Sequence, residues 1–194
     1  MNIEEKAYYR NWAKDIRKTL DLKKVSCVIE GKIKDLDSYK SAKTVMSYMA
    51  KDIEVSFHGL FDDKSKEWFL PVVGALPAKG EARQGRHGMP LLVVSYIPER
   101  TKLVKRKFNI LEPEISNEKY FEQTNKKIKL DLIFVPGLCF DKKGSRIGFG
   151  MGFYDAFLKL NPNTFKIGTC PKDCLVDSLP RDMWDECVDL VITD

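Results

Sequence analysis

The stretch that decides the fold is LDLIFVPGLCFDKKGSRIGFGMGFYDAFLKL, residues 130–160. It opens with an unbroken apolar run at residues 130–135, which Pro136-Gly137 ends. A polar loop, DKKGSR, comes next, and glycines then alternate with larger residues before a helix-forming segment that reaches Asn161-Pro162. Unalternated apolar runs are typical of strands buried on both faces. The stretch therefore predicts a buried strand, a glycine loop and a helix.

Five further apolar runs of the same kind are separated by polar segments that are long enough to form helices. They occupy residues 44–49, 68–73, 91–97, 165–168 and 188–192. Buried strands that alternate with helices indicate an α/β protein with helices on both faces of a mainly parallel sheet. We find neither an internal repeat nor a linker rich in proline and glycine. The sequence therefore predicts a three-layer α/β/α fold in one domain, residues 1–194.

The first 20 residues predict an amphipathic helix with two stripes. At 100° per residue, one stripe is apolar and the other basic. The apolar stripe consists of Tyr9, Trp12, Ala13, Ile16 and Leu20, and the basic stripe consists of Lys6, Arg10, Lys14 and Arg17. The basic stripe has two interpretations, a solvated helix surface or a binding site for an anion.

The composition is that of an ordinary globular protein. The chain has 194 residues, a net charge of +5 and 43% hydrophobic residues, which excludes collagen-like, mucin-like and disordered chains. The modest positive charge suits anionic small molecules better than nucleic acid. No apolar run approaches the roughly 18 residues of a membrane span, and no secretory signal precedes the first helix. We expect a cytoplasmic protein whose five cysteines are buried, reduced thiols.

The glycine loop is the candidate anion site. Glycines at 148, 150 and 152 would let the backbone approach a phosphate at the start of a helix, and Lys142, Lys143 and Arg146 would add positive charge. The spacing matches neither the P-loop nor the dinucleotide fingerprint. A plain turn between strand and helix is the alternative. Asp155 is either a ligand of a phosphate-bound cation or a carboxylate that stabilises the helix N-terminus.

The segment FVPGLCFDKKGSRIGFGMGFYDAFL resembles the most distinctive motif of the 5-formyltetrahydrofolate cyclo-ligase (5,10-methenyltetrahydrofolate synthetase) family. Shorter agreements follow in the family's order: K-x-x-x-R at Lys6 and Arg10, the segment 48–55, FLP at 69–71, NILEP at 109–113 and the tail LPRDMWDECVDLVIT. The resemblance implies a fold like NagB, RpiA and CoA transferases (NagB/RpiA/CoA-transferase-like). It also implies a ligase that converts ATP and 5-formyltetrahydrofolate into 5,10-methenyltetrahydrofolate, ADP and phosphate, with Mg²⁺.

The same resemblance assigns roles to residues of this chain. Lys6 and Arg10 would reach the phosphates of ATP from one face of the first helix. Asp155 and Asp185 would hold Mg²⁺, with Asp182 and Asp189 as neighbours of the second position. Arg146, Tyr154 and Glu54 would be the catalytic residues. The nucleotide would also be bound by the whole loop, which consists of Arg146, Ile147, Gly148, Phe149, Gly150, Met151, Gly152, Phe153 and Tyr154.

For the folate, the resemblance implies that Glu54 accepts hydrogen bonds from the N–H groups of the pterin. Met49 and Phe108 would add apolar contacts, and a role in the core is the alternative for both. The loop residues Phe149, Gly150, Met151, Gly152 and Phe153 would border the substrate as well. Phe153 and Met151 depart from the family pattern, which has tyrosine at the first position and often glycine or lysine at the second.

Two other functions remain open at this stage. A non-catalytic relative could bind RNA or a protein through the basic residues Lys102, Lys105, Arg106 and Lys107, whose alternative is a solvated loop. A kinase or ligase for another substrate could use the same phosphate site. The leading expectation is an enzyme that works on 5-formyltetrahydrofolate and ATP, as a monomer or weak dimer, with no membrane and no nucleic acid as partners.

Overall fold

The computed structural model describes residues 3–73, 91–106, 110–114 and 129–194. Its centre is a six-stranded sheet with the strand order β11-β9-β6-β1-β2-β3. The bounds are β1 (Thr44–Met46), β2 (Glu67–Val73), β3 (Leu91–Tyr96), β6 (Leu132–Val135), β9 (Phe165–Thr169) and β11 (Leu190–Ile192). These are the six predicted apolar runs. Every neighbouring pair is parallel except β2 and β3, so the prediction of a mainly parallel sheet is confirmed.

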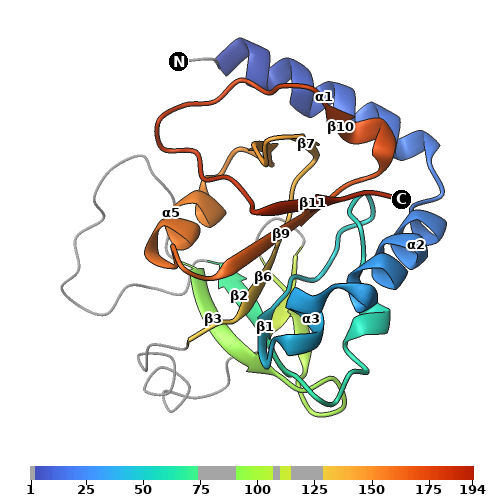
Figure 1. Cartoon of the computed structure of the whole chain (residues 1–194), viewed down its shortest axis with the longest axis vertical. Coiled ribbons are helices and arrows are strands. Elements are labelled where there is room, and N and C mark those ends of the chain that lie inside the picture. The colour runs from blue at the N-terminus through green and yellow to red at the C-terminus, as the bar shows by residue number, and fades with distance from the viewer. Residues whose placement is uncertain (1–2, 74–90, 107–109, 115–128) are drawn as a thin grey trace.

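Helices cover both faces of the sheet, as Figure 1 shows with α3 and α5 on opposite sides of the strands. The long helices are α1 (Ile3–Thr19) and α2 (Leu22–Asp35), and the shorter ones are α3 (Asp37–Ser41) and α5 (Phe153–Leu160). Strand β6 shows how the two cores form. Leu132 and Phe134 pack with α2 and α3, whereas Ile133 and Val135 pack with α1 and α5. Successive side chains of a strand point to opposite faces, so an apolar run fills both cores.

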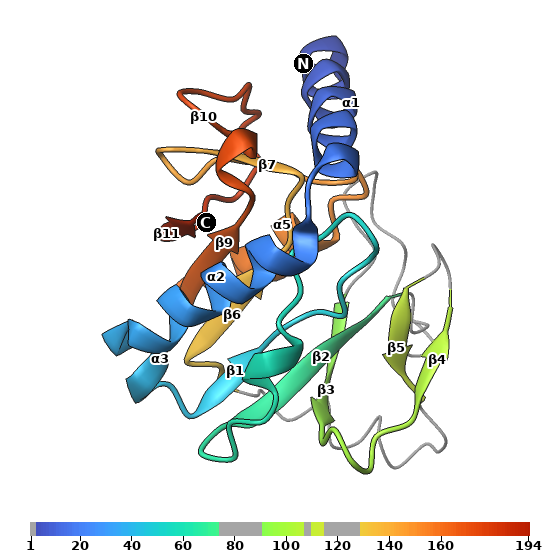
Figure 2. The same cartoon turned by 90° about the vertical axis from the view of Figure 1, so that its right-hand side faces the viewer.

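In the described part of the chain, two small sheets and two 3₁₀ helices complete the fold. The first sheet, with the order β10-β7-β8, contains β7 (Cys139–Asp141), β8 (Arg146–Ile147) and β10 (Leu175–Val176). The second pairs β4 (Leu103–Lys105) with β5 (Leu111–Pro113) and stands beside β3 and β2 in Figure 2. The 3₁₀ helices are η1 (His58–Leu60) and η3 (Lys172–Cys174). Strands β7 and β8 carry the chain from β6 to the glycine loop.

The prediction for the basic stripe of α1 is wrong for Arg17. This residue is neither on a solvated helix surface nor in an anion site, because it is buried inside the protein. The Arg17 side chain is 1% exposed. Its guanidinium donates to the carbonyls of Leu138 at 2.7 Å, Gly137 at 2.9 Å and Ile53 at 2.8 Å. A buried arginine is tolerated when its rigid set of N–H donors is satisfied in this way. Arg17 therefore ties α1 to two loops that carry site residues.

The cysteines are free thiols. Cys139, Cys170 and Cys174 are buried, which confirms the prediction for these three, whereas Cys27 is exposed and Cys187 is half-buried. Burial raises the pKa of the Cys139 and Cys170 thiols to about 12. Within the described ranges, the helices are too short or too polar to cross a membrane.

Candidate functional site

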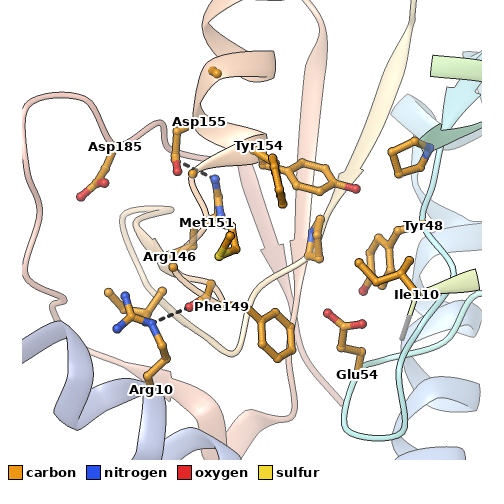
Figure 3. Close-up of a pocket in the computed structure, with 18 of the residues that line it drawn as sticks. Arg10, Tyr48, Glu54, Ile110, Arg146, Phe149, Met151, Tyr154, Asp155 and Asp185 are labelled. Atoms are coloured by element: carbon orange, nitrogen blue, oxygen red, sulfur yellow. Dashed lines mark hydrogen bonds and ion pairs between the residues drawn. The ribbon is translucent and has the colours of Figure 1, made fainter. Parts of the chain in front are cut away.

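One cavity of about 1260 Å³ contains almost all of the predicted site residues. It opens at the carboxyl edge of the parallel strands, where Tyr48 and Met49 follow β1 and Pro136 follows β6. The glycine loop, the first turns of α1 and the C-terminal tail form the other walls (Figure 3). Ligand sites of open α/β sheets lie at this edge, because the loops that leave neighbouring strands meet there.

The glycine loop packs closely against Arg10. Gly150 has φ = +94°, and a Cβ atom at this position would lie 3.3 Å from the Arg10 guanidinium carbon. Arg10 Nε donates to the Gly148 carbonyl at 2.9 Å. Gly152 has φ = +69° and precedes the first turn of α5. A larger residue at Gly150 would be strained and would push Arg10 away, so the spacing of the glycines brings the loop and α1 together.

Arg146 lies behind the loop and pairs with Asp155. The Arg146 side chain is 7% exposed, and its Nη2 donates to Asp155 Oδ1 at 2.7 Å. The Glu186 backbone N–H also donates to Asp155 Oδ1, at 3.2 Å. Arg146 Nε is buried and has no hydrogen-bond partner in the described structure. The pair therefore places one cation and one carboxylate at the cavity wall and leaves one arginine donor unused.

Tyr154 points from α5 toward Tyr48 across the cavity (Figure 3). Its hydroxyl is buried and has no hydrogen-bond partner in the described structure. The Arg146 guanidinium carbon lies 5.9 Å from the centre of the Tyr154 ring. Burial, followed by the neighbouring Tyr48 and Glu54, raises the pKa of Tyr154 well above its usual value. Tyr154 therefore offers an uncharged O–H group that a bound ligand can use.

Lys6 joins the first helix to the C-terminal tail. Its ammonium pairs with Asp182 Oδ2 at 2.9 Å and also with Asp185 Oδ2. Burial alone would lower the pKa of Lys6, but the hydrogen bonds to Asp185 and Asp182 outweigh it, so the pKa is raised. Asp189 lies elsewhere and accepts from the Lys166 backbone N–H at 2.7 Å. Of the acidic residues near the second metal position, Asp182 and Asp185 therefore face the cavity.

The predicted Mg²⁺ ligands, Asp155 and Asp185, supply carboxylate oxygens. Asp155 and Asp185 line the same cavity, and Figure 3 shows them on the same side of Arg146. In the described part of the chain, no group of three or more histidine, cysteine, aspartate or glutamate side chains could hold a metal alone. Mg²⁺ commonly takes one or two carboxylates and completes its coordination with phosphate and water oxygens. The two aspartates fit that mode of binding.

Glu54 forms the opposite end of the cavity. Its side chain is buried, with 7% exposure, and Oε2 accepts from the Lys51 backbone N–H at 2.8 Å. The Tyr48 hydroxyl donates to the Val55 carbonyl at 3.1 Å, which holds the turn around Glu54. Burial raises the pKa of Glu54, although the Lys51 N–H and the charges of Lys51 and Arg17 oppose this. Buried Met49 lines the same end and also packs in the hydrophobic core.

Replacing Glu54 with glutamine is expected to change how stability depends on pH. A raised carboxyl pKa means that the folded protein binds the proton more tightly than the unfolded chain, whose carboxyl has a pKa of about 4.3. Stability contributed by Glu54 therefore falls as pH rises from that value through the raised pKa. Glutamine keeps an oxygen acceptor for the Lys51 N–H but has no charge.

We expect the Glu54→Gln variant to equal or exceed the parent in free energy of unfolding at pH 7–8, and the difference to shrink toward pH 4. Urea unfolding between pH 4 and pH 8 measures it. A loss of stability of the same size at every pH would show that the carboxylate stabilises the fold, contrary to its buried, weakly paired position.

Some of the residues that the sequence predicted for the site do not lie at the cavity in the structure. Lys142 and Lys143 do not line the cavity; both are exposed, and Lys142 pairs with Asp177 at 2.6 Å. They lie in the turn that joins β7 to β8, so of the predicted basic residues of this loop only Arg146 lines the cavity. Phe108 lies outside the described residues, as does Lys107 of the basic cluster.

The described part of that cluster is largely paired within the β4–β5 hairpin. Lys102 bonds Glu114 at 2.9 Å, and Arg106 lies 3.9 Å from Glu112. The positive charges of these two residues are therefore offset by neighbouring carboxylates, which weakens the case for an RNA-binding surface on them.

Sequence reasoning assigned no role to several residues that line the cavity, namely Tyr48, Lys51, Pro71, Pro136 and Trp184. Tyr48 and Lys51 lie in the segment 48–55 that carried Met49 and Glu54, so their closeness to those residues was the available signal. Trp184 adjoins Asp185 in the tail. Ile147, Phe149, Met151 and Phe153 of the predicted loop line the cavity wall.

Comparison with known proteins points to a single family. The model of the 5-formyltetrahydrofolate cyclo-ligase family matches residues 6–194. The 5-formyltetrahydrofolate cyclo-ligase of Haemophilus influenzae is 30% identical over 156 residues, which cover 78% of this chain and 75% of that protein. A probable 5-formyltetrahydrofolate cyclo-ligase of Schizosaccharomyces pombe is 30% identical over 176 residues, covering 82% and 78%.

Two solved structures are similar over most of their length. The NMR structure of Aquifex aeolicus 5,10-methenyltetrahydrofolate synthetase has a TM-score of 0.69 and 28% identity, and the match covers 96% of this chain and 88% of that one. The 5,10-methenyltetrahydrofolate synthetase of Mycoplasma pneumoniae has a TM-score of 0.67 and covers 98% and 99%. Its identity of 21% supports a shared fold alone.

Proposed function

The chain belongs to the 5-formyltetrahydrofolate cyclo-ligase family, and from this premise we propose that it closes the ring of 5-formyltetrahydrofolate to 5,10-methenyltetrahydrofolate at the expense of ATP, with Mg²⁺. The family makes it a ligase of folate metabolism. One observation carries the finer proposal. A single cavity places paired cations and carboxylates at one end and a buried carboxylate at the other, so a nucleotide and a folate would meet between them.

The nucleotide end would receive the triphosphate of ATP. Lys6, Arg10 and Arg146 line it, and the glycine loop lies between Arg10 and Arg146. Lys6 and Arg146 are neutralised by Asp185, Asp182 and Asp155 in the structure. On binding of the nucleotide with its metal, the lysine and arginine would turn to phosphate oxygens. Phosphoryl transfer needs this combination of positioning and charge neutralisation more than it needs covalent help from the protein.

Asp155 and Asp185 would then be free to hold Mg²⁺ together with phosphate oxygens. When bound, Mg²⁺ neutralises charge that develops on the transferred phosphate. The exchange of partners keeps charges balanced in both states, because each carboxylate is next to a cation before binding and next to a metal afterwards. It also implies that metal and nucleotide bind better together than either binds alone.

The reaction itself has two steps. The formyl oxygen at N5 attacks the γ-phosphorus of ATP, the bond from that phosphorus to the bridging oxygen breaks, and ADP leaves. The N10 amine then attacks the activated formyl carbon and loses its proton, and the C–O bond breaks to release phosphate. Arg146 would stabilise the transferred phosphoryl group, and the uncharged Tyr154 O–H would donate to the formyl or phosphate oxygen.

The folate end would recognise the pterin. Glu54 has one oxygen engaged by the Lys51 N–H, and within the described residues its other oxygen accepts no hydrogen bond. A carboxylate can accept from two neighbouring N–H groups of a pterin. Met49 and Phe153 would border the ring from either side of the cavity. Phe153 brings no hydroxyl to this end, so Tyr154 would act as the donor.

The test incubates the purified protein with Mg-ATP and 5-formyltetrahydrofolate and follows the absorbance of the methenyl product, with ADP measured in parallel. We expect one ADP for each methenyl product formed, and no product when EDTA removes the metal. Hydrolysis of ATP without methenyl product would refute the proposed acceptor. No reaction of either kind would refute the proposed activity.

We further propose that the protein works in the cytoplasm as a monomer. Free, buried thiols suit a reducing compartment. All the residues assigned above come from one chain, so the site needs no second copy.

A further inference from the structure

Two lysines from different parts of the chain lie against one aromatic ring at the folate end of the cavity. The Nζ atom of Lys51 is 4.5 Å from the centre of the Phe149 ring, and that of Lys14 is 5.9 Å away. Lys51 follows β1, whereas Lys14 lies on α1. Phe149 projects from the glycine loop and is 36% exposed. The tertiary structure alone brings these three residues together.

These lysines differ from Lys6 and Arg146, the paired cations of the nucleotide end, because they have no carboxylate partner in the described structure. Lys6 pairs with Asp182 and Asp185, and Arg146 pairs with Asp155. Within the described residues, neither Lys14 nor Lys51 forms an ion pair. A cation–π contact at a partly exposed ring contributes only about 0.5–1 kcal/mol. Two positive charges are therefore held loosely on long stems and remain available to an anion.

Their location separates them from the nucleotide end. Figure 3 shows Phe149 between Arg10 and Glu54. Lys51 lines the cavity and is close enough to Glu54 to affect its pKa, whereas Lys14 stands outside the lining, on α1. Lys51 therefore places a positive charge inside the cavity near Glu54, and Lys14 places a second one outside it, with Phe149 in contact with both. An anion that fits this arrangement starts in the cavity and extends out of it.

We propose that Phe149, Lys51 and Lys14 form the subsite for the aminobenzoyl-glutamate tail of the folate. This inference rests on the proposed function, because it takes 5-formyltetrahydrofolate as the substrate. That molecule has an uncharged pterin at one end and a glutamate with two carboxylates at the other. With the pterin at Glu54, the Phe149 ring contacts the benzoyl group, and the lysines bind the carboxylates as they leave the cavity.

The decisive experiment compares two ligands that differ only in the tail. Binding of 5-formyltetrahydrofolate is compared with that of its 5-formyltetrahydropteroyl methylamide analogue, the tail-less ligand, which keeps the aminobenzoyl group but has neither the glutamate nor any carboxylate. Both are measured by titration calorimetry without nucleotide, in the parent and in Lys51→Met and Lys14→Met variants. We expect Lys51→Met to weaken binding of the tailed ligand about tenfold, the strength of one charge-assisted contact, and Lys14→Met to weaken it less. Binding of the tail-less ligand should stay unchanged in both variants.

Control variants use the same helix and the same charge. Lys18→Met also removes a lysine from α1, but Lys18 pairs with Asp15 and is remote from Phe149, so binding of both ligands should match the parent. Lys51→Arg keeps the charge and should retain the preference for the tailed ligand. Added salt should weaken binding of the tailed ligand in the parent more than in Lys51→Met.

The outcomes separate this inference from the proposed function. Equal weakening of both ligands, or no weakening of either, overturns the tail subsite. A raised requirement for ATP in Lys51→Met, with folate binding intact, also overturns it and assigns Lys51 to the nucleotide. If the parent binds the folates but forms no methenyl product, the proposed activity fails while the tail comparison still decides the subsite. If the parent binds neither folate, both proposals fall.

Discussion

Replacing Arg146 with methionine is expected to lower kcat/KM for the methenyl-forming reaction about 10³-fold. Arg146 is more enclosed than Lys6, and its guanidinium lies between the glycine loop, Asp155 and the Tyr154 ring. Arginines that neutralise a transferred phosphoryl group contribute this much because they act where water is excluded and need no rearrangement during the reaction. Steady-state rates at varied ATP, at saturating folate, measure the effect.

Two comparisons make the Arg146 result specific. Arg146→Lys keeps a charge but loses the planar set of donors, so we expect a partial loss. Folate binding without nucleotide should remain within about twofold of the parent in the methionine variant, because Glu54 and Met49 lie at the other end. Equal losses in folate binding and in turnover would mean that the substitution has disturbed the whole cavity. An unchanged ATP requirement would contradict the assigned role.

Replacing Arg17 with methionine is expected to lower the free energy of unfolding by about 3–5 kcal/mol. Arg17 is enclosed by α1, the Pro136-Gly137 turn and the segment before Glu54, and it donates to three carbonyls. Methionine has a similar length and fills part of the space, but it leaves those acceptors without their donor. Each hydrogen bond from a charged group to a buried acceptor contributes about 1.5–3 kcal/mol, and the three are not additive.

Urea unfolding of Arg17→Met, followed by tryptophan fluorescence and by circular dichroism, measures this change. Lys18→Met, at the exposed neighbouring position, is the matched control and should change stability little. Arg17→Lys should fall between the two, because one ammonium cannot reach three carbonyls in the geometry of a guanidinium. A methionine variant as stable as the parent would show that solvent or the thiol of Cys174 replaces the lost donor.

The strands were predictable because burial on both faces leaves a mark in the sequence. β6 and β9 lie in the middle of the sheet, and their apolar runs stand out against polar neighbours. The antiparallel position of β3 at the edge was not predictable from its run, since LLVVSY is apolar whichever way it pairs. The glycine loop was predicted as a ligand site because glycines in that pattern before a helix permit close backbone approach.

For the site, the sequence identified some of the cavity residues and misplaced others. Residues close in sequence to a motif, such as Met49, Glu54 and Arg146, were identified through the resemblance. Arg17 was read as part of a solvated or anion-binding stripe, because helical periodicity separates faces but does not say which face meets a buried carbonyl. Lys142 and Lys143 adjoin the glycine loop in sequence, yet the β7–β8 turn directs them outward.

The stretch 130–160 thus determined, by itself, the order of strand, loop and helix and the chemical character of the loop, because backbone preferences and burial act over a few residues. Only the tertiary structure decided which distant side chains share a charge or a ring: Lys6 with Asp185, Arg17 with the carbonyls after β6, and Lys14 and Lys51 with Phe149. Such pairs depend on how α1 and the C-terminal tail pack across the sheet, and that packing is set by the combined surfaces of many elements rather than by any local pattern.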